Sequence, residues 1–269
     1  MPLFSPRVVH AFFVAAIFSL FPIVANAQEA EPVKPTGTRA QRPYISLYTG
    51  TTQAQNADLR LLQPVLGTDA TYHDVSWRGR PFSGSPYYGV KVGIFLPKSP
   101  RIGFEAEFNH SKMYAKLEER KLLTGTFNGQ SVNGVETVGD RVQKYQITNG
   151  INSFSLNVLY RVPVAVSVKY PDGRFQPYVG GGPQYTFLYS INIINSLGVK
   201  EKYHPNGWGY QLFGGGRFMA TPHIGLFLEG KYQHGDAVSL IADQGNTEGG
   251  RGITDIRMAQ LAGGVFYQF

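Results

Sequence analysis

The sequence predicts an all-β protein, an eight-stranded antiparallel transmembrane β-barrel of the outer-membrane type with long external loops. The chain of 269 residues contains 18 Phe, 16 Tyr and 32 Gly, a composition that favours β-structure with aromatic side chains at its boundaries. Several segments alternate apolar and polar residues. Beyond residue 27 no apolar stretch reaches the roughly 18 residues of a membrane-spanning helix. Since there is no cysteine, disulfides cannot hold the fold together.

The first 27 residues have the features of a secretory signal peptide. Arg7 precedes an apolar run over 11–24, and Ala25-Asn26-Ala27 provides a small-x-small cleavage site. The run is shorter than the roughly 20 residues of a membrane anchor. We therefore expect export with cleavage after residue 27. Residues 28–42 are rich in proline and polar residues, which predicts a disordered periplasmic lead-in, and 43–269 form the predicted barrel domain.

The eight predicted strands share a period of two residues, with aromatic and aliphatic side chains on one face. We place them at 43–52, 86–97, 101–113, 147–162, 174–190, 207–218, 223–234 and 254–269. The connections alternate between short and long, as short periplasmic turns and long external loops do in such barrels. The long connections are 53–85, 114–146, 191–206 and 235–253. A hairpin hidden in one of these would instead give ten strands.

The last strand ends on Phe269, with Tyr267 and Val265 on the same face. This ending resembles the one that the barrel assembly machinery of the outer membrane recognises. The sequence thus predicts that machinery as a partner, location in the cell outer membrane, and a monomer.

The formal net charge of +7 does not by itself point to a nucleic-acid partner. Once Arg7 is removed, the excess of positive charge is accounted for by predicted periplasmic positions such as Lys98, Arg101, Arg161 and Arg217. There, long basic side chains can reach lipid headgroups. The aromatic residues follow the barrel faces and form no basic platform, so we expect no nucleic-acid binding.

Charged residues of both signs are predicted inside the barrel. If the turn at 98–100 joins its two strands, Lys91 lies opposite Glu107. A set of paired charges then fills the narrow interior of an eight-stranded barrel, with Glu105, Glu229, Lys231 and Arg161. The pairs are interpreted as structural, because a charge buried alone is costly. A proton relay is the alternative.

His110 and Lys112 differ in parity from Glu107, and so share the face of Phe104 and Phe108. We expect them to point toward lipid at the outer rim, at the height of lipid A sugars and phosphates. A structural histidine in an aromatic girdle is the alternative. Ser111 points to the opposite face, so it cannot form a nucleophile–base pair with His110.

The other histidines suggest at most an unspecified metal site. His73 with Asp74, His204, and His234 with Asp236 could converge with His110 over the mouth of the barrel. No ligand spacing requires it. A divalent metal is therefore an open possibility.

Five segments together resemble the OmpA-like outer-membrane β-barrel family that includes the lipid A oxidase of rhizobia. They are 75–93, 103–115, 149–161, 175–185 and 209–217. The sequence departs from the family pattern at Glu105, where a small residue is expected, and at Glu107, where Asp is expected.

The resemblance implies oxidation of the proximal glucosamine of lipid A, with molecular oxygen as co-substrate. Matched positions would supply the catalytic residues His110, Lys112, Glu107 and Tyr114. Lipid-binding residues would be Trp77, Arg78, Tyr87 and Tyr88. The alternative function is a non-catalytic OmpA-like barrel that stabilises the envelope or presents its loops to partners.

Overall fold

The computed structural model describes residues 42–82, 84, 86–198 and 202–269. The predicted signal peptide and all of the predicted lead-in except Arg42 lie outside these residues. The described structure is antiparallel β-structure with one short 3₁₀ helix, η1 (Val138–Asp140). The predicted all-β antiparallel class is therefore confirmed. Among the described residues, no helix has the length and apolar character needed to cross a membrane.

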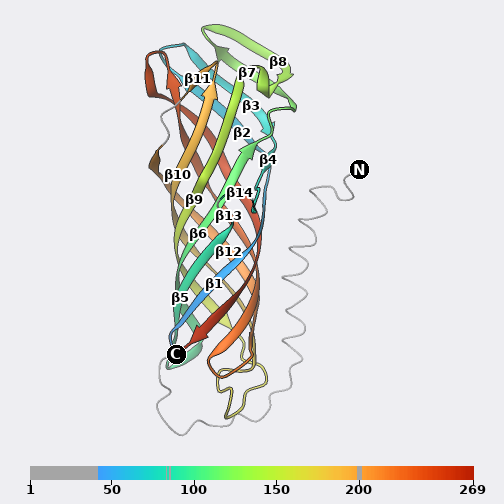
Figure 1. Cartoon of the computed structure of the whole chain (residues 1–269), viewed down its shortest axis with the longest axis vertical. Helices are drawn as coiled ribbons and strands as arrows, with labels where there is room; N and C mark the ends of the chain where they lie inside the picture. The colour runs from blue at the N-terminus through green and yellow to red at the C-terminus, as the bar shows by residue number, and fades with distance from the viewer. Residues whose placement is uncertain (1–41, 83, 85, 199–201) are drawn as a thin grey trace.

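Eight long strands pair in a closed antiparallel order, which Figure 1 shows as a tall ring. In ring order they are β1 (Tyr44–Ala54), β5 (Tyr88–Leu96), β6 (Ser99–Ala115), β9 (Val142–Arg161), β10 (Phe175–Ile194), β12 (Tyr203–Met219), β13 (Ile224–Asp243) and β14 (Asn246–Gln268). Pairing of β1 with β14 closes the ring. Each of the eight predicted strands corresponds to one member of the ring.

The predicted register between the second and third ring strands is confirmed. Lys91 on β5 lies opposite Glu107 on β6, and Tyr88 lies opposite His110. Because side chains alternate between the two faces of a strand, this register sends Lys91 and Glu107 inward and Tyr88 outward.

The ring changes character along its length. We call the end that carries Phe269 the terminal end and the opposite end the loop end (Figure 1). Toward the terminal end, outward side chains are apolar and exposed, as with Leu156 and Val158 on β9, whereas inward Ser155 and Asn157 are buried. At the loop end the interior is apolar instead, with Ile147 and Tyr145 fully buried.

The predicted external loops are wrong in part, because they contain regular strands. These are β2 (Ala57–Gln63), β3 (Thr68–Val75), β4 (Trp77–Arg78), β7 (Arg120–Phe127), β8 (Gln130–Thr137) and β11 (Leu197–Gly198). Beyond the pairing with β1, β14 pairs with β2, and the sheet continues through β3, β7 and β8. Hairpins therefore exist inside the long connections, but they extend the sheet at the loop end and add no strand to the ring.

The predicted loop 235–253 is also wrong, since β13 and β14 continue through it to the pair Asp243–Asn246. The physical reason is that the alternation of apolar inward residues continues, with Ala237, Ile241 and Ile256 buried in the interior.

These loop-end strands share one apolar core. We call them, with the adjoining parts of β6, β9, β10, β13 and β14, the loop-end module. Its buried core residues include Leu59, Leu61, Tyr72, Trp77, Met113, Leu123, Phe127, Tyr145, Ile147, Ile241 and Met258. An apolar core of this kind is what strands in water need, because burial of apolar surface is their main stabilisation. The module therefore packs like part of a water-soluble protein.

A charged contact ties two connections of the module together. Glu136 on β8 accepts hydrogen bonds from Tyr72 Oη at 2.6 Å and from Arg141 Nε at 2.6 Å. Burial alone raises the pKa of Glu136, but the hydrogen bonds from Arg141 and Tyr72 outweigh it and lower that pKa below its ordinary 4.5.

Replacing this carboxylate should weaken the module in a pH-dependent way. We expect Glu136→Gln to cost about 1 kcal/mol at neutral pH, since one charge-assisted contact is lost at a partly exposed site. A lowered folded-state pKa stabilises above the unfolded value, and this contribution disappears as the pH falls through the folded value. Protease susceptibility of the module measured against pH tests this. A difference from wild type that stays constant into the acid range would contradict it.

Candidate functional site

The predicted catalytic residue Glu107 lies inside the ring, within a buried ion network. Lys231 Nζ contacts Glu107, and Lys91 Nζ donates to both oxygens of Glu229 at 2.8 and 2.7 Å. All four side chains are almost completely buried. Lys91 also pairs with Glu105 at 3.4 Å, so the predicted pairing of charges inside the ring is confirmed, although Lys91 pairs with Glu229 and Glu105 and not with Glu107 directly opposite. The ring is narrow enough for side chains from distant strands to meet across it.

The carboxylate oxygens also accept hydrogen bonds from neutral donors. Tyr44 Oη donates to Glu105 Oε2 at 2.7 Å, and Tyr178 Oη donates to Glu229 Oε2 at 2.8 Å. Gln211 Nε2 donates to Glu107 Oε2 at 2.6 Å. The interpretation of this network as structural is consistent with such saturation, because buried carboxylates are tolerated when paired and hydrogen-bonded.

Two arginines assigned to the periplasmic surface instead have buried side chains. Arg217 pairs with Glu105 at 3.3 Å and lies over the Tyr44 ring at 4.0 Å. Arg161 pairs with Asp172 at 2.9 Å. The prediction that their charge reaches lipid headgroups is wrong, because both side chains point to the inner face and pair with carboxylates there. The second prediction for Arg161, that it lies among the paired charges inside the barrel, is confirmed.

His110 occupies the outer face of β6, as its parity predicts, but it is only 4% exposed. Its ring stacks on Tyr88 of β5 with centroids 5.1 Å apart. Nδ1 lies 2.8 Å from Asn152 Oδ1, and an amide oxygen accepts, which places the proton on Nδ1. Nε2 is then the basic nitrogen, and it is buried without a hydrogen-bond partner among the described residues.

An irregularity in β9 creates this arrangement. Ser111 pairs with Ile151, but Met113 pairs with Ile147, so extra residues of β9 bulge opposite Lys112. Gly150 within the bulge has φ +124°, and a Cβ there would lie 2.5 Å from His110 Nδ1. Glycine is therefore required for His110 to reach its partner.

Lys112 and Tyr114 continue the outward row beyond His110. Lys112 is 4% exposed, and its ammonium group lies beside Gly84. Tyr114 Oη is 2.8 Å from Thr148 Oγ1, and the Arg80 guanidinium lies 4.8 Å from the centre of the Tyr114 ring. The row thus combines cations and hydrogen-bonding groups. Exposed fractions of 4% for His110 and Lys112 and 8% for Tyr114 make the row less accessible from outside than the sequence predicted.

Of the four predicted lipid-binding residues, two lie inside. Trp77 packs edge-on to Tyr145 in the module core, and Tyr87 Oη donates to Gln260 Oε1 at 3.0 Å within the ring. These positions contradict lipid contact for Trp77 and Tyr87. Tyr88 is exposed on the outer face, and Arg78 is exposed beside Glu118.

A belt of aromatic rings crosses the outer face at the height of His110. Successive contacts run from Tyr88 to Phe108, Phe154, Phe187, Tyr185 and Trp208. Sequence reasoning found the aromatic alternation of each strand. It placed His110 in an aromatic girdle as one alternative but did not identify the residues of the belt, because they come from five strands whose relative register only the pairing fixes.

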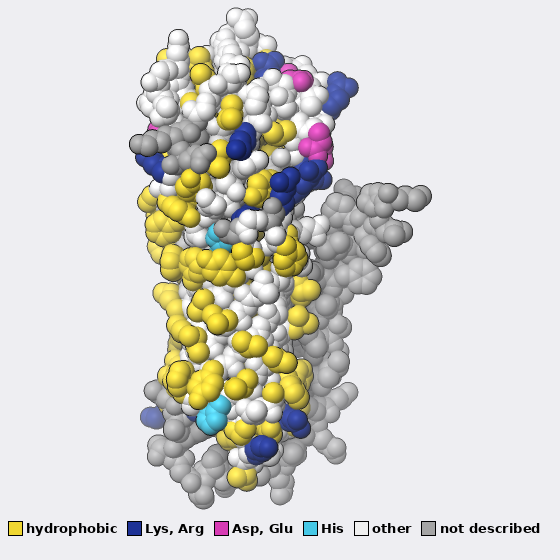
Figure 2. All heavy atoms as spheres, in the orientation of Figure 1, with side chains coloured by type: hydrophobic (Ala, Val, Ile, Leu, Met, Phe, Trp, Pro, Cys, Tyr) yellow, Lys and Arg dark blue, Asp and Glu magenta, His cyan; other side chains and the backbone are white. Residues whose placement is uncertain are grey.

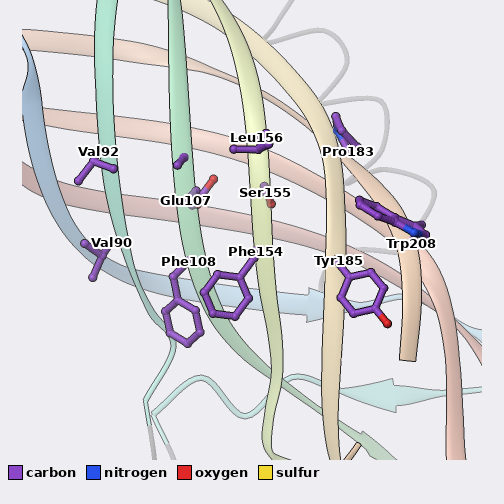
Figure 3. A pocket seen from close by; sticks show the side chains of 11 residues that line it. Val90, Val92, Glu107, Phe108, Phe154, Ser155, Leu156, Pro183, Tyr185 and Trp208 are labelled. Carbon is purple, nitrogen blue, oxygen red and sulfur yellow. The ribbon is translucent and has the colours of Figure 1, made fainter. Parts of the chain in front are cut away.

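A groove of about 400 Å³ opens on the outer face below this belt. Figure 3 shows the rings of Phe108, Phe154 and Tyr185 in a row, with Val92 and Leu156 across from them. Its lining is almost wholly apolar. The groove was not predicted, because its depth depends on small side chains between large ones on neighbouring strands.

The suggested metal convergence is not formed. No group of three or more His, Asp or Glu side chains in the described ranges is placed to hold a metal ion. His73 instead contacts Asp58 at 3.1 Å, and His204 Nε2 lies 3.0 Å from the Val238 carbonyl oxygen.

No protein-family model matches the chain, and no curated protein is similar to it in sequence. Solved structures do resemble it. The chain is similar to the outer membrane protein OprG from Pseudomonas aeruginosa (12% identity, 87% of this chain and 98% of that chain, TM-score 0.47). It is also similar to a major outer membrane protein from Thermus thermophilus (13% identity, 86% and 100%, TM-score 0.45) and to Neisserial surface protein A (10% identity, 86% and 100%, TM-score 0.39).

Proposed function

We propose that this chain is an outer-membrane β-barrel protein whose ring crosses the bilayer. The observation that supports this most is the reversal of polarity between the two ends. Between the aromatic belt and a second aromatic group, Tyr267 and Phe269, the outward face is an apolar band. Figure 2 shows this band on the visible face, with charged side chains gathered at both ends. On β13 the band runs from Ile224 to Tyr232, close to the 9–11 residues of a spanning strand.

We further propose that the row His110, Lys112 and Tyr114 acts on lipid A. The reaction implied by the sequence resemblance is oxidation of the proximal glucosamine, with oxygen as the electron acceptor. Support comes from the position of the row beside the aromatic belt, at the height of outer-leaflet sugars. A buried basic Nε2 at His110 is suited to accept a proton from a sugar hydroxyl. Glu107 faces the interior, so in this proposal its role is structural.

A non-catalytic envelope protein is the second candidate, and the loop-end module favours it. The module presents an outermost hairpin, β7–β8, on which Leu122 and Val135 are exposed. A packed extracellular module of this kind suits contact with partners outside the cell.

Mass spectrometry of lipid A from cells with and without the gene tests the enzymatic proposal. We expect an oxidised species in cells that express the protein with oxygen and divalent metal supplied. His110→Ala should reduce it at least about 100-fold, the range lost with a general base. His223→Ala, at the terminal end of the ring, serves as the matched control. Lipid A that is unchanged by the gene would refute oxidation and leave the envelope role.

A further inference from the structure

We infer that the groove on the outer face binds one acyl chain of a phosphorylated glycolipid of the outer leaflet, whose phosphate is held by Lys112 and Arg80. This inference rests on the proposed function in one respect, that the ring crosses the membrane. It adds a binding site that does not depend on oxidation.

The shape of the groove suits a single chain. It is formed where Ala106 on β6 lies between the larger Val92 of β5 and Leu156 of β9. A second hollow of about 580 Å³ shares these three residues and continues toward the terminal end, past Gly93 and Phe104. From Phe108 to Phe104 the strand advances about 13 Å. Because strands of such barrels tilt by about 35–45°, this corresponds to a depth of about 10 Å, roughly two thirds of one leaflet of the roughly 30 Å hydrocarbon core.

The end of the groove nearer the loop end indicates in which leaflet the bound lipid lies. Phe108, Phe154 and Trp208 line the groove and also belong to the aromatic belt. Such belts mark the level at which acyl chains meet headgroups. The loop-end module lies beyond this belt, so the groove opens upward into the outer leaflet.

The chemistry directly above the belt suits an anionic headgroup. Along the outer face of β6, His110, Lys112 and Tyr114 follow Phe108 at intervals of about 7 Å. Arg80 adds an exposed cation above Tyr114. His110 provides an independent sign of a ligand, because its side chain is more than nine-tenths buried and its Nε2 lacks a partner among the described residues. Lysine and arginine beside a hydrogen-bonding imidazole are suited to phosphate and sugar hydroxyls.

Binding of defined lipids to the full-length protein in detergent, followed by native mass spectrometry, tests the inference. The probes are lipid A with two phosphates, the same lipid without phosphates, and phosphatidylglycerol. Ala106→Trp fills the groove without touching the interior of the ring. Leu228→Trp is its matched control, since Leu228 is exposed on β13 at the opposite side of the ring. Heat-modifiable migration confirms that each variant is folded.

We expect Ala106→Trp to weaken binding of both forms of lipid A about tenfold, and Leu228→Trp to leave it unchanged. Lys112→Gln should weaken binding of the phosphorylated form only, whereas the exposed Lys202→Gln should have no effect. If Ala106→Trp and Leu228→Trp bound lipid A equally well, the proposal that the groove binds an acyl chain would be overturned. Equal, Ala106-dependent binding of phosphatidylglycerol would overturn the glycolipid assignment.

Failure of the proposed function gives different results. If the protein were absent from the outer-membrane fraction of cells, the membrane-spanning proposal would fail. If lipid A were bound in an Ala106-dependent way but never oxidised, the oxidase proposal would fail and the groove would stand.

Discussion

Glu229→Leu is expected to lower the free energy of unfolding of the ring by about 3–5 kcal/mol. Glu229 is fully buried, and its two oxygens accept from Lys91 while one also accepts from Tyr178. Removing it leaves Lys91 Nζ with Glu105, at 3.4 Å, as its remaining carboxylate partner, and a buried charge that loses compensation is costly. The temperature at which heat-modifiable migration is lost measures the effect.

The stability costs of two further variants distinguish this buried network from exposed ion pairs. Glu118→Gln removes an exposed pair with Arg78 and should cost less than about 1 kcal/mol. The double variant Glu107→Gln with Lys231→Met removes both members of one buried pair. It should cost clearly less than the sum of its single variants. Additive costs would show that the network does not couple these residues.

Leu61→Asp is expected to open the loop-end module while the ring persists. Leu61 is fully buried in the apolar core, so an aspartate there places an unpaired charge among Leu59, Tyr145 and their neighbours. The cost should be at least about 4 kcal/mol. The interior of the ring toward the terminal end is held by its own pairs and does not share this core.

Limited proteolysis measures this outcome. We expect new cleavage within 57–75 or 120–137 in the variant, with heat-modifiable migration of the remaining ring unchanged. Val135→Asp changes an exposed residue of β8 in the same module and should leave the cleavage pattern as in wild type. Loss of both the module and the ring in Leu61→Asp would show that they unfold as one unit.

The loop end illustrates where prediction from sequence stopped. Period-two alternation identifies a strand when one face is apolar over many residues, and β9, β13 and β14 satisfied this near the terminal end. The strands of 57–75 and 120–137 are short and contain glycine, threonine and asparagine. Their apolar residues, such as Leu59 and Leu123, are buried only because the strands pack around one shared core, and the sequence of each strand alone does not indicate this.

Pairing of charges shows a second limit. The turn expected at 98–100 predicts that Lys91 lies opposite Glu107, and the observed register of β5 with β6 agrees. The choice of Glu229 as the partner of Lys91 depends on the distance across the ring, which no pair of neighbouring strands contains.

By itself the sequence determined the all-β class, the eight ring strands, the register of β5 with β6, and the outward direction of His110 and Lys112. All of these follow from alternation along a strand, which is a local property. Only the tertiary structure decided that Trp77 and Tyr87 point inward, that Gly150 lets His110 meet Asn152, and that Ala106 lies at the bottom of a groove. Each of these depends on side chains from separate strands meeting at one height, and that height is set by how the ring closes.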